Sequence, residues 1–268
     1  MKNKYIGIFF LLLLVLSSCK TEYEKIRTGG DPQKMYTKAM AYYESGDYLK
    51  AQGLIETALP FYRGKAEAEE LYFKMAYTYY YLQDYLLAAS YFQNFGRTFL
   101  NSKYREEADF MSADSYYQSS PSFMLDQAYT HKAIEAFQSF ANRYPSSQRV
   151  GEVNKRIDEL RGKLEQKAFY NAKLYYDMED YQAANRALED ILVSFPDINR
   201  GEEIRFLIVR SHYNLAVNSV LGKQKERLSE ASLKAKAFIK RYPKSKYKRD
   251  VKTILKTIKA QLKSNKYE

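Results

Sequence analysis

The chain has 268 residues and carries 43 Lys and Arg against 32 Asp and Glu, for a formal net charge of +11. A hydrophobic content of 46% excludes wholesale disorder and is ample for a buried core. With only 2 His and 1 Cys, the composition argues against a Cys/His zinc site and against a disulfide framework. The net positive charge is compatible with a nucleic-acid partner, with a membrane-surface partner, or with neither.

The N-terminus has the pattern of a secretory signal. Lys2 and Lys4 precede an apolar run over residues 5–16, which is too short for a comfortable membrane span. The run ends in Leu16-Ser17-Ser18-Cys19, which resembles the bacterial lipobox. We therefore expect residues 1–18 to be a lipoprotein signal peptide that is removed, and Cys19 to carry the acyl chains of a lipid anchor. The alternative is a plain signal peptide with an incidental Cys.

The residues after Cys19 indicate in which membrane the anchored chain is expected to lie. Lys20 stands where an Asp would resemble an inner-membrane retention signal, so an outer-membrane address is favoured. A cell-envelope location makes nucleic acid a poor candidate partner. Residues 19–34 end in a Gly-Gly-Asp-Pro stretch, and we expect them to form a flexible tether.

A helical repeat fills the rest of the chain. Residues 39–51, 76–88 and 172–184 share one pattern, in which an Ala is followed nine residues later by a Tyr and twelve residues later by a second Ala. Small residues allow two helices to approach closely, and the Tyr after the turn fills the gap between pairs. The pattern is similar to the tetratricopeptide repeat. Two further copies start at Ala113 and Ser211 and carry eight extra residues in the turn.

The predicted fold class is all-α, a tetratricopeptide-repeat solenoid of about five helix pairs. Repeats 1–3 are expected within residues 35–147. Residues 148–268 are expected to hold a long linking helix, repeats 4–5 and a basic C-terminal helix. The linking helix is predicted from apolar residues near heptad spacing, which are Val150, Val153, Ile157, Leu160 and Leu164.

The first helices of repeats 1–3 supply a candidate peptide-binding groove. An aromatic groove suits an extended peptide, which it holds by stacking and by scattered hydrogen bonds. The alternative is that these are ordinary half-exposed aromatics packing on their neighbours. Tyr42, Tyr48, Tyr79 and Tyr85 are expected to pack in the core. The candidate groove residues are Tyr36, Met40, Tyr43, Phe73, Tyr77, Tyr80, Asp114 and Tyr117.

Most of the net charge lies at the C-terminus. Residues 223–268 hold 16 Lys and Arg against 4 Asp and Glu. Apolar residues at helical spacing predict an amphipathic helix with a basic face, which carries Lys252, Lys256 and Lys259. This face is either merely solvated or contacts an acidic partner or anionic lipid heads.

No pattern of catalysis, cofactor binding or metal binding stands out. The sequence has no P-loop, no GxGxxG and no GxSxG. His131 and His212 stand alone on predicted helices, where a His is usually a packed or surface residue. The expectation is therefore no enzyme, no cofactor and no metal.

The order of these features resembles the BamD family, the lipoproteins of the outer-membrane β-barrel assembly (BAM) complex. The likeness covers residues 19–268 and includes the lipobox, the repeats and the helix ends Tyr144-Pro145-Ser146-Ser147 and Tyr242-Pro243-Lys244-Ser245. Residues 125–130 and 218–220 look like the version found in Bacteroidota.

The resemblance implies a non-enzymatic scaffold on the periplasmic face of the outer membrane. It implies binding of a BamA-like barrel protein through its POTRA domains, mainly by the C-terminal half. It also implies that the N-terminal repeats receive unfolded outer-membrane β-barrel clients and read their C-terminal β-signal, which ends in an aromatic residue. The alternative function is another envelope scaffold with the same repeats, for cell-wall synthesis or glycan uptake.

Overall fold

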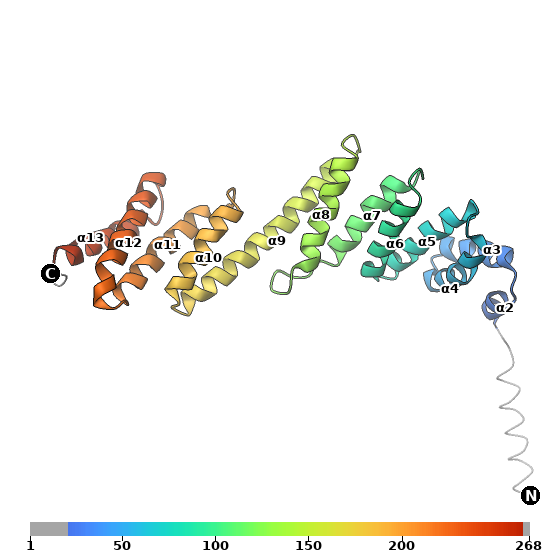
Figure 1. The fold of residues 1–268 in the computed structure, drawn as a ribbon, viewed down its shortest axis with the longest axis horizontal. Helices are drawn as coiled ribbons and strands as arrows, with labels where there is room; N and C mark the ends of the chain where they lie inside the picture. The colour runs from blue at the N-terminus through green and yellow to red at the C-terminus, as the bar shows by residue number, and fades with distance from the viewer. Residues whose placement is uncertain (1–20, 265–268) are drawn as a thin grey trace, which may run out of the picture. The chain divides into compact units, whose positions relative to one another are not determined.

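A computed structural model describes residues 21–264, in which all regular secondary structure is helical (Figure 1). The helices are α2 (Glu22–Thr28), α3 (Pro32–Glu44), α4 (Tyr48–Ala58), the short 3₁₀ helix η1 (Leu59–Tyr62), α5 (Glu67–Tyr81), α6 (Tyr85–Thr98), α7 (Arg105–Gln118), α8 (Ala128–Arg143), α9 (Val150–Asp177), α10 (Tyr181–Ser194), α11 (Gly201–Val217), α12 (Leu221–Arg241) and α13 (Lys248–Lys263). The predicted signal peptide and Cys19 lie outside the described residues.

The helices pack as consecutive antiparallel pairs, which confirms the predicted tetratricopeptide-repeat solenoid. The pairs are α3 with α4, α5 with α6, α7 with α8, the end of α9 with α10, and α11 with α12. The predicted linking helix is α9, which has 28 residues. The predicted basic C-terminal helix is α13, which packs on α12.

The turns inside the pairs show why the pattern repeats. Gly46 has a positive φ of 80°, as expected for a glycine after a helix end. Gln83 and Glu179 hold the equivalent positions with φ of 64° and 62°, so these two repeats form the same left-handed turn without glycine. The next helix then begins at an Asp, whose side chain accepts a backbone N–H bond at Asp47 and Asp180.

The chain divides into two compact units. Unit 1 comprises residues 21–120 and 128–157, and unit 2 comprises residues 121–127 and 158–264 within the described range. The sequence placed a boundary before the linking helix, at 147/148. The compact units divide within α9: Arg156 near its start pairs with Asp114 of repeat 3, whereas Phe169 and Ala172 near its end pack in the core of unit 2. The repeat boundary at 147/148 stays a prediction.

Each unit has its own hydrophobic core. In unit 1 the N-terminal cluster joins Met35, Leu54, Ile55 and Leu71. In unit 2 one cluster joins α9, α10 and α11, and two more join α11, α12 and α13. Among the described residues, these clusters extend from Tyr23 to Leu262.

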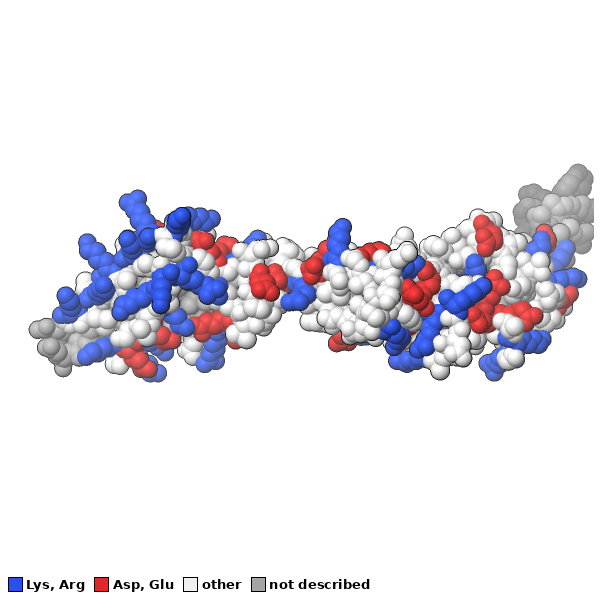
Figure 2. All heavy atoms as spheres, turned by 90° about the horizontal axis from the view of Figure 1, so that it is seen from above, with Lys and Arg blue, Asp and Glu red and all other residues white. Residues whose placement is uncertain are grey.

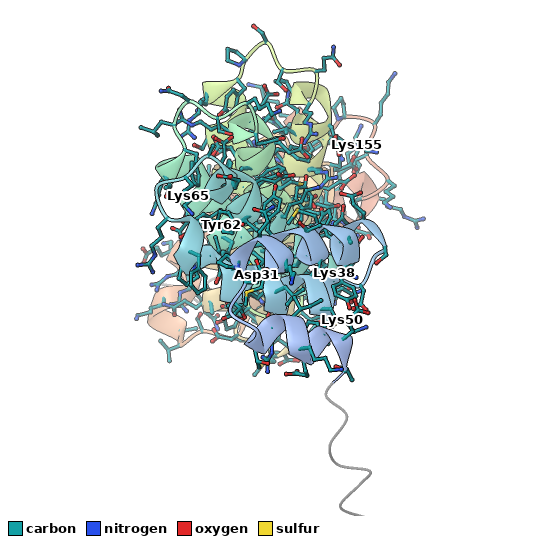
Figure 3. All side chains as sticks on the ribbon, turned by 90° about the vertical axis from the view of Figure 1, so that its right-hand side faces the viewer. Asp31, Lys38, Lys50, Tyr62, Lys65 and Lys155 are labelled. Carbon is teal, nitrogen blue, oxygen red and sulfur yellow. The ribbon has the colours of Figure 1, made fainter. Side chains whose placement is uncertain are left out.

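The expectation of a flexible tether over residues 19–34 is wrong for residues 22–28, which form α2. Thr21 caps this helix, and Glu22 pairs with Lys38 of α3 at 2.9 Å. The Tyr23 ring meets the Tyr42 ring edge-on at 6.1 Å, and Ile26 packs on the core of repeat 1. Figure 3 shows α2 beside α3, near the labelled Lys38. A seven-residue helix depends on such tertiary contacts, so the local sequence did not predict it.

Candidate functional site

The candidate groove residues lie in unit 1, on the first helix of each repeat. Tyr36, Met40 and Tyr43 lie on α3; Phe73, Tyr77 and Tyr80 lie on α5; and Asp114 and Tyr117 lie on α7. The structure therefore brings them to corresponding positions of three successive helices, as the repeat predicts. Their exposure differs widely, and that difference decides which of them a ligand can reach.

A ladder of hydrogen bonds joins the first helix of one repeat to the first helix of the next. In each rung a tyrosine hydroxyl donates to a carboxylate 30 to 34 residues further on. The rungs are Tyr36 to Glu70 (2.5 Å), Tyr77 to Glu107 (2.6 Å) and Tyr80 to Asp114 (2.6 Å). Bonds to a charged acceptor are among the stronger ones, so the ladder fixes the spacing of the repeats.

The ladder also changes the acidity of its tyrosines. Burial, followed by the Glu70 carboxylate, raises the pKa of Tyr36 to about 12. Burial and the hydrogen bond to Glu107 likewise raise the pKa of Tyr77 above that of a free phenol. Both hydroxyls therefore stay protonated at neutral pH and remain donors to their carboxylates.

Four rings gather where α3 and α5 end, and we call Tyr43, Tyr48, Tyr77 and Tyr81 the tyrosine cluster. The Tyr81 ring stacks on Tyr48 at 4.4 Å and on Tyr77 at 5.7 Å, and it lies 6.3 Å from Tyr43. Tyr81 is 44% exposed, the most open ring of the four. Tyr81 is not among the groove residues predicted from the sequence, although it belongs to the run Tyr79-Tyr80-Tyr81 at a helix end.

A cation completes the cluster. The Lys74 ammonium lies 4.1 Å from the centre of the Tyr43 ring and pairs with Glu44 at 3.4 Å. Burial raises the pKa of Tyr43 well above that of a free phenol, so this ring too stays neutral. The cluster thus presents apolar ring faces with a positive charge at one edge.

Two of the candidate residues belong to the core and not to an open groove. Phe73 is 8% exposed, because it stacks on Tyr104 at 4.6 Å and meets Phe95 at 5.2 Å. Met40 is half-buried and packs against the N-terminal core cluster. Their helical position was predicted correctly, but contacts from later helices cover their side chains.

Asp114 is also covered. It is 3% exposed, accepts the Tyr80 hydroxyl and forms an ion pair with Arg156 of α9. The Arg156 guanidinium lies over the Tyr117 ring at 4.9 Å, and Tyr117 meets Phe137 edge-on at 6.2 Å. Asp114 and Tyr117 therefore fasten the start of α9 to repeat 3, and the expectation that Asp114 lines an open groove is wrong.

The arrangement favours aromatic contacts over hydrogen bonding. The phenolic protons of Tyr36, Tyr77 and Tyr80 already go to carboxylates, so they are not available to a ligand. The exposed ring of Tyr81, with Tyr48 beneath it, offers a stacking platform. The part of the predicted groove that can receive an apolar or aromatic side chain is therefore the tyrosine cluster.

Hollows open on the second helices of the pairs, away from the predicted residues. One, of about 580 Å³, lies among α6, α7 and α8 and is lined by Phe140 and Arg143. In unit 2 a hollow of about 650 Å³ lies among α10, α11 and α12, lined by Phe238 and Arg241 at the corresponding repeat positions. The second hollow thus repeats the first, as expected where two repeats meet.

Lys252, Lys256 and Lys259 are exposed on α13 in unit 2. The opposite face of this helix buries Val251 and Ile258 against the preceding helices. The predicted basic amphipathic helix is therefore present, with its apolar face occupied.

Comparison with known proteins assigns the chain to a protein family. Residues 29–228 and 163–268 match the family model YfiO, described as an outer membrane lipoprotein. The chain belongs to this family. A candidate outer membrane protein assembly factor BamD of Aquifex aeolicus (strain VF5) is 25% identical over 263 residues, which span 97% of this chain and 85% of that protein. The resemblance to the BamD family is thereby confirmed.

The two histidines of the chain differ in their surroundings. His212 is buried between Glu189 at 3.3 Å and Glu230 at 3.7 Å, and burial lowers its pKa. His131 is exposed on α8. Within residues 21–264 no cluster of His, Cys, Asp and Glu has the geometry of a metal site. In the same range, no helix combines the length and apolar character that crossing a membrane requires.

Proposed function

We propose that the chain is a scaffold for the folding and insertion of outer-membrane β-barrel proteins; the relative from Aquifex aeolicus is named an outer membrane protein assembly factor. The observation that carries the proposal is family membership over residues 29–268, together with the helix-pair architecture. Repeat solenoids of this kind present extended surfaces for other proteins. The chemistry of a scaffold needs no catalytic group, and the site described above consists of aromatic and ionic packing.

In this proposal a BamA-like barrel protein binds through its POTRA domains, mainly to the C-terminal half of the chain. Unit 2 offers helix pairs for such a contact, and its hollow among α10, α11 and α12 is lined by apolar side chains together with several cations and Glu189. Apolar anchors framed by charged residues are the usual composition of a protein interface.

Unfolded β-barrel clients are received by unit 1 in the same proposal. A β-signal ends in an aromatic residue, and the tyrosine cluster provides an exposed ring on which such a side chain can stack. The Lys74 ammonium over the Tyr43 ring, which now pairs with the exposed Glu44, could exchange that partner for a terminal carboxylate. The cluster therefore replaces the longer groove predicted from the sequence.

We further propose that Cys19 is acylated and holds the chain on the periplasmic face of the outer membrane. The lipobox-like residues 16–19 support this, as does the description of the family as lipoproteins. Several acyl chains anchor a protein stably, since each buried CH₂ contributes about 0.8 kcal/mol.

Depletion of the chain in its own cell tests the proposed function. We expect the content of assembled, heat-modifiable β-barrel proteins in the outer membrane to fall, while the content of soluble periplasmic proteins stays constant. Normal barrel levels after depletion would reject the assembly role.

A further inference from the structure

One side of α13 carries an unbroken row of cations. Their spacing alternates between three and four residues, so one face of the helix holds all of them. All are exposed, and we call them the cationic stripe: Arg249, Lys252, Lys256, Lys259 and Lys263. At a rise of about 1.5 Å per residue, the stripe is roughly 21 Å long.

In the part of the chain that the structure describes, no carboxylate pairs with the charges of the stripe. Within residues 21–264 none of its five side chains forms an ion pair or a hydrogen bond. In unit 1, by contrast, many cations meet a carboxylate, as Lys38 meets Glu22 and Arg143 meets Asp109. Like charges three and four residues apart repel, so the stripe is suited to an external source of negative charge.

The positive surface extends beyond the helix. Lys244 and Lys246 are exposed in the turn between α12 and α13, and Lys236 and Lys240 are exposed on α12. A shallow hollow of about 620 Å³ lies at the start of α13, lined by Lys246, Lys248, Arg249, Lys252 and Lys256 with the hydroxyls of Ser245 and Thr253. Figure 2 shows Lys and Arg gathered over this C-terminal end of the chain.

Few carboxylates interrupt this surface. Glu202 is held by the hydroxyl of Ser245, and Asp250 is the acidic residue of the first turn of α13. The hydroxyl of Thr253 is bound to the backbone carbonyl of Arg249. The hollow therefore offers cationic groups to an anion, and its neutral hydroxyls are already engaged.

The apolar face of α13, opposite the cationic stripe, is buried and limits how the helix can contact a membrane. Val251 and Ile258 are fully buried, and Ile254 and Leu255 pack against the same clusters. A helix that enters a bilayer needs a free apolar face. Because that face is occupied here, any contact of α13 with a membrane takes place at the level of the headgroups.

We propose that the cationic stripe binds the headgroups of anionic phospholipids and so lays unit 2 against a membrane surface. A membrane supplies negative charge over an area, which matches cations spread over α12, the turn and α13 better than a single acidic helix does. The proposal is independent of the assembly role and of client binding. It adds a second contact with the membrane beside the lipid anchor.

Binding to vesicles tests the proposal without the anchor. The chain from residue 21 to residue 268 contains the described hydrophobic clusters and lacks Cys19, so its binding reports on the folded surface without a lipid anchor. We expect it to co-sediment with vesicles containing roughly 30% phosphatidylglycerol and not with pure phosphatidylcholine. Sodium chloride on the order of 0.5 M should release it, because exposed charges are then screened.

A matched pair of variants locates the contact. Each cation near an anionic surface contributes about fivefold in affinity, so K252E/K256E/K259E should weaken binding by about 100-fold or more. K65E/K103E/K132E makes the same charge change on unit 1, where these lysines lie over tyrosine rings, and should bind nearly as well as the parent chain. Circular dichroism checks that both variants are folded.

Two results would overturn the proposal. The first is equal binding to anionic and neutral vesicles. The second is unchanged vesicle binding by K252E/K256E/K259E. The parent chain could fail to bind anionic vesicles, while K252E/K256E/K259E loses a protein partner in a pull-down. In that case the stripe is a protein-binding surface and the membrane assignment is wrong.

Discussion

The hydroxyl of Tyr80 on α5 donates a 2.6 Å hydrogen bond to the buried carboxylate of Asp114 on α7, and Arg156 of α9 pairs with the same carboxylate. One side chain thus connects the first helices of repeats 2 and 3 with the start of the linking helix. Because Asp114 is buried, its charge depends on these two partners.

Replacement of Asp114 should therefore be more costly than replacement of Tyr80. Asp114→Asn removes the buried one of the two carboxylates that pair with Arg156 and leaves it only the more exposed Glu152, so it should lower the free energy of unfolding by about 3 kcal/mol. Tyr80→Phe removes one hydrogen bond and should cost about 1.5 kcal/mol. Urea denaturation of both variants measures the difference, and a smaller loss in Asp114→Asn than in Tyr80→Phe would contradict the ion pair.

Tyr81 should matter for binding more than for stability. Tyr81→Ala removes the exposed ring of the tyrosine cluster and should weaken binding of a β-signal peptide about tenfold. Fluorescence anisotropy with a labelled peptide ending in Phe measures this, and the same peptide ending in Ala shows whether the aromatic residue is read. The matched control is Tyr175→Ala in unit 2, a ring of nearly equal exposure at 43%. Equal effects of the two substitutions would place the peptide elsewhere.

Helix α2 should detach when the space beneath Tyr23 is filled. A Cβ on Gly53 would overlap the Tyr23 hydroxyl, so Gly53→Ala should expose residues 22–28 to amide hydrogen exchange while α4 stays protected. Gly162→Ala on α9 meets open space and should stabilise its helix by up to about 1 kcal/mol. Unchanged protection of residues 22–28 in Gly53→Ala would show that α2 does not rest on that surface.

The stability of unit 2 should depend on pH through His212. Burial lowers the pKa of this imidazole, against the opposing pull of Glu230 and Glu189. The unfolded chain therefore takes up a proton near pH 6.5 that the folded chain takes up only at lower pH. The free energy of unfolding should fall as the pH drops from about 7.5 to about 5.5. His212→Gln should reduce that slope in urea melts, and an identical slope in the variant would assign it to other groups.

The positions of the helices could be predicted because each helix pair has the same small residues at the same spacing and the same turn between its helices. Ala39, Ala76 and Ala172 are fully buried where two helices meet, as their spacing indicated. The linking helix was also predicted within a few residues, since its heptad pattern is continuous. These features depend on local sequence and on periodicity, and both can be read from a single sequence.

The errors concern contacts between segments that are distant in sequence. Phe73 has the helical position of a groove residue, but Tyr104, some thirty residues later, stacks over it. Asp114 is covered because Arg156 reaches it from the linking helix. Tyr81 lies at a helix end where the pattern stops, and its exposure depends on Tyr48 beneath it. The burial of each of these side chains is decided by residues of a neighbouring repeat or of the linking helix, and the pattern of one repeat does not contain them.

The central claim is that the chain is a scaffold of β-barrel assembly, and the most direct measurement is co-purification from its own envelope. An affinity-tagged chain, extracted in mild detergent, should recover a POTRA-containing barrel protein in near-stoichiometric amount, identified by mass spectrometry. Recovery of cell-wall synthases without any POTRA-containing protein would contradict the account and would favour a different envelope scaffold.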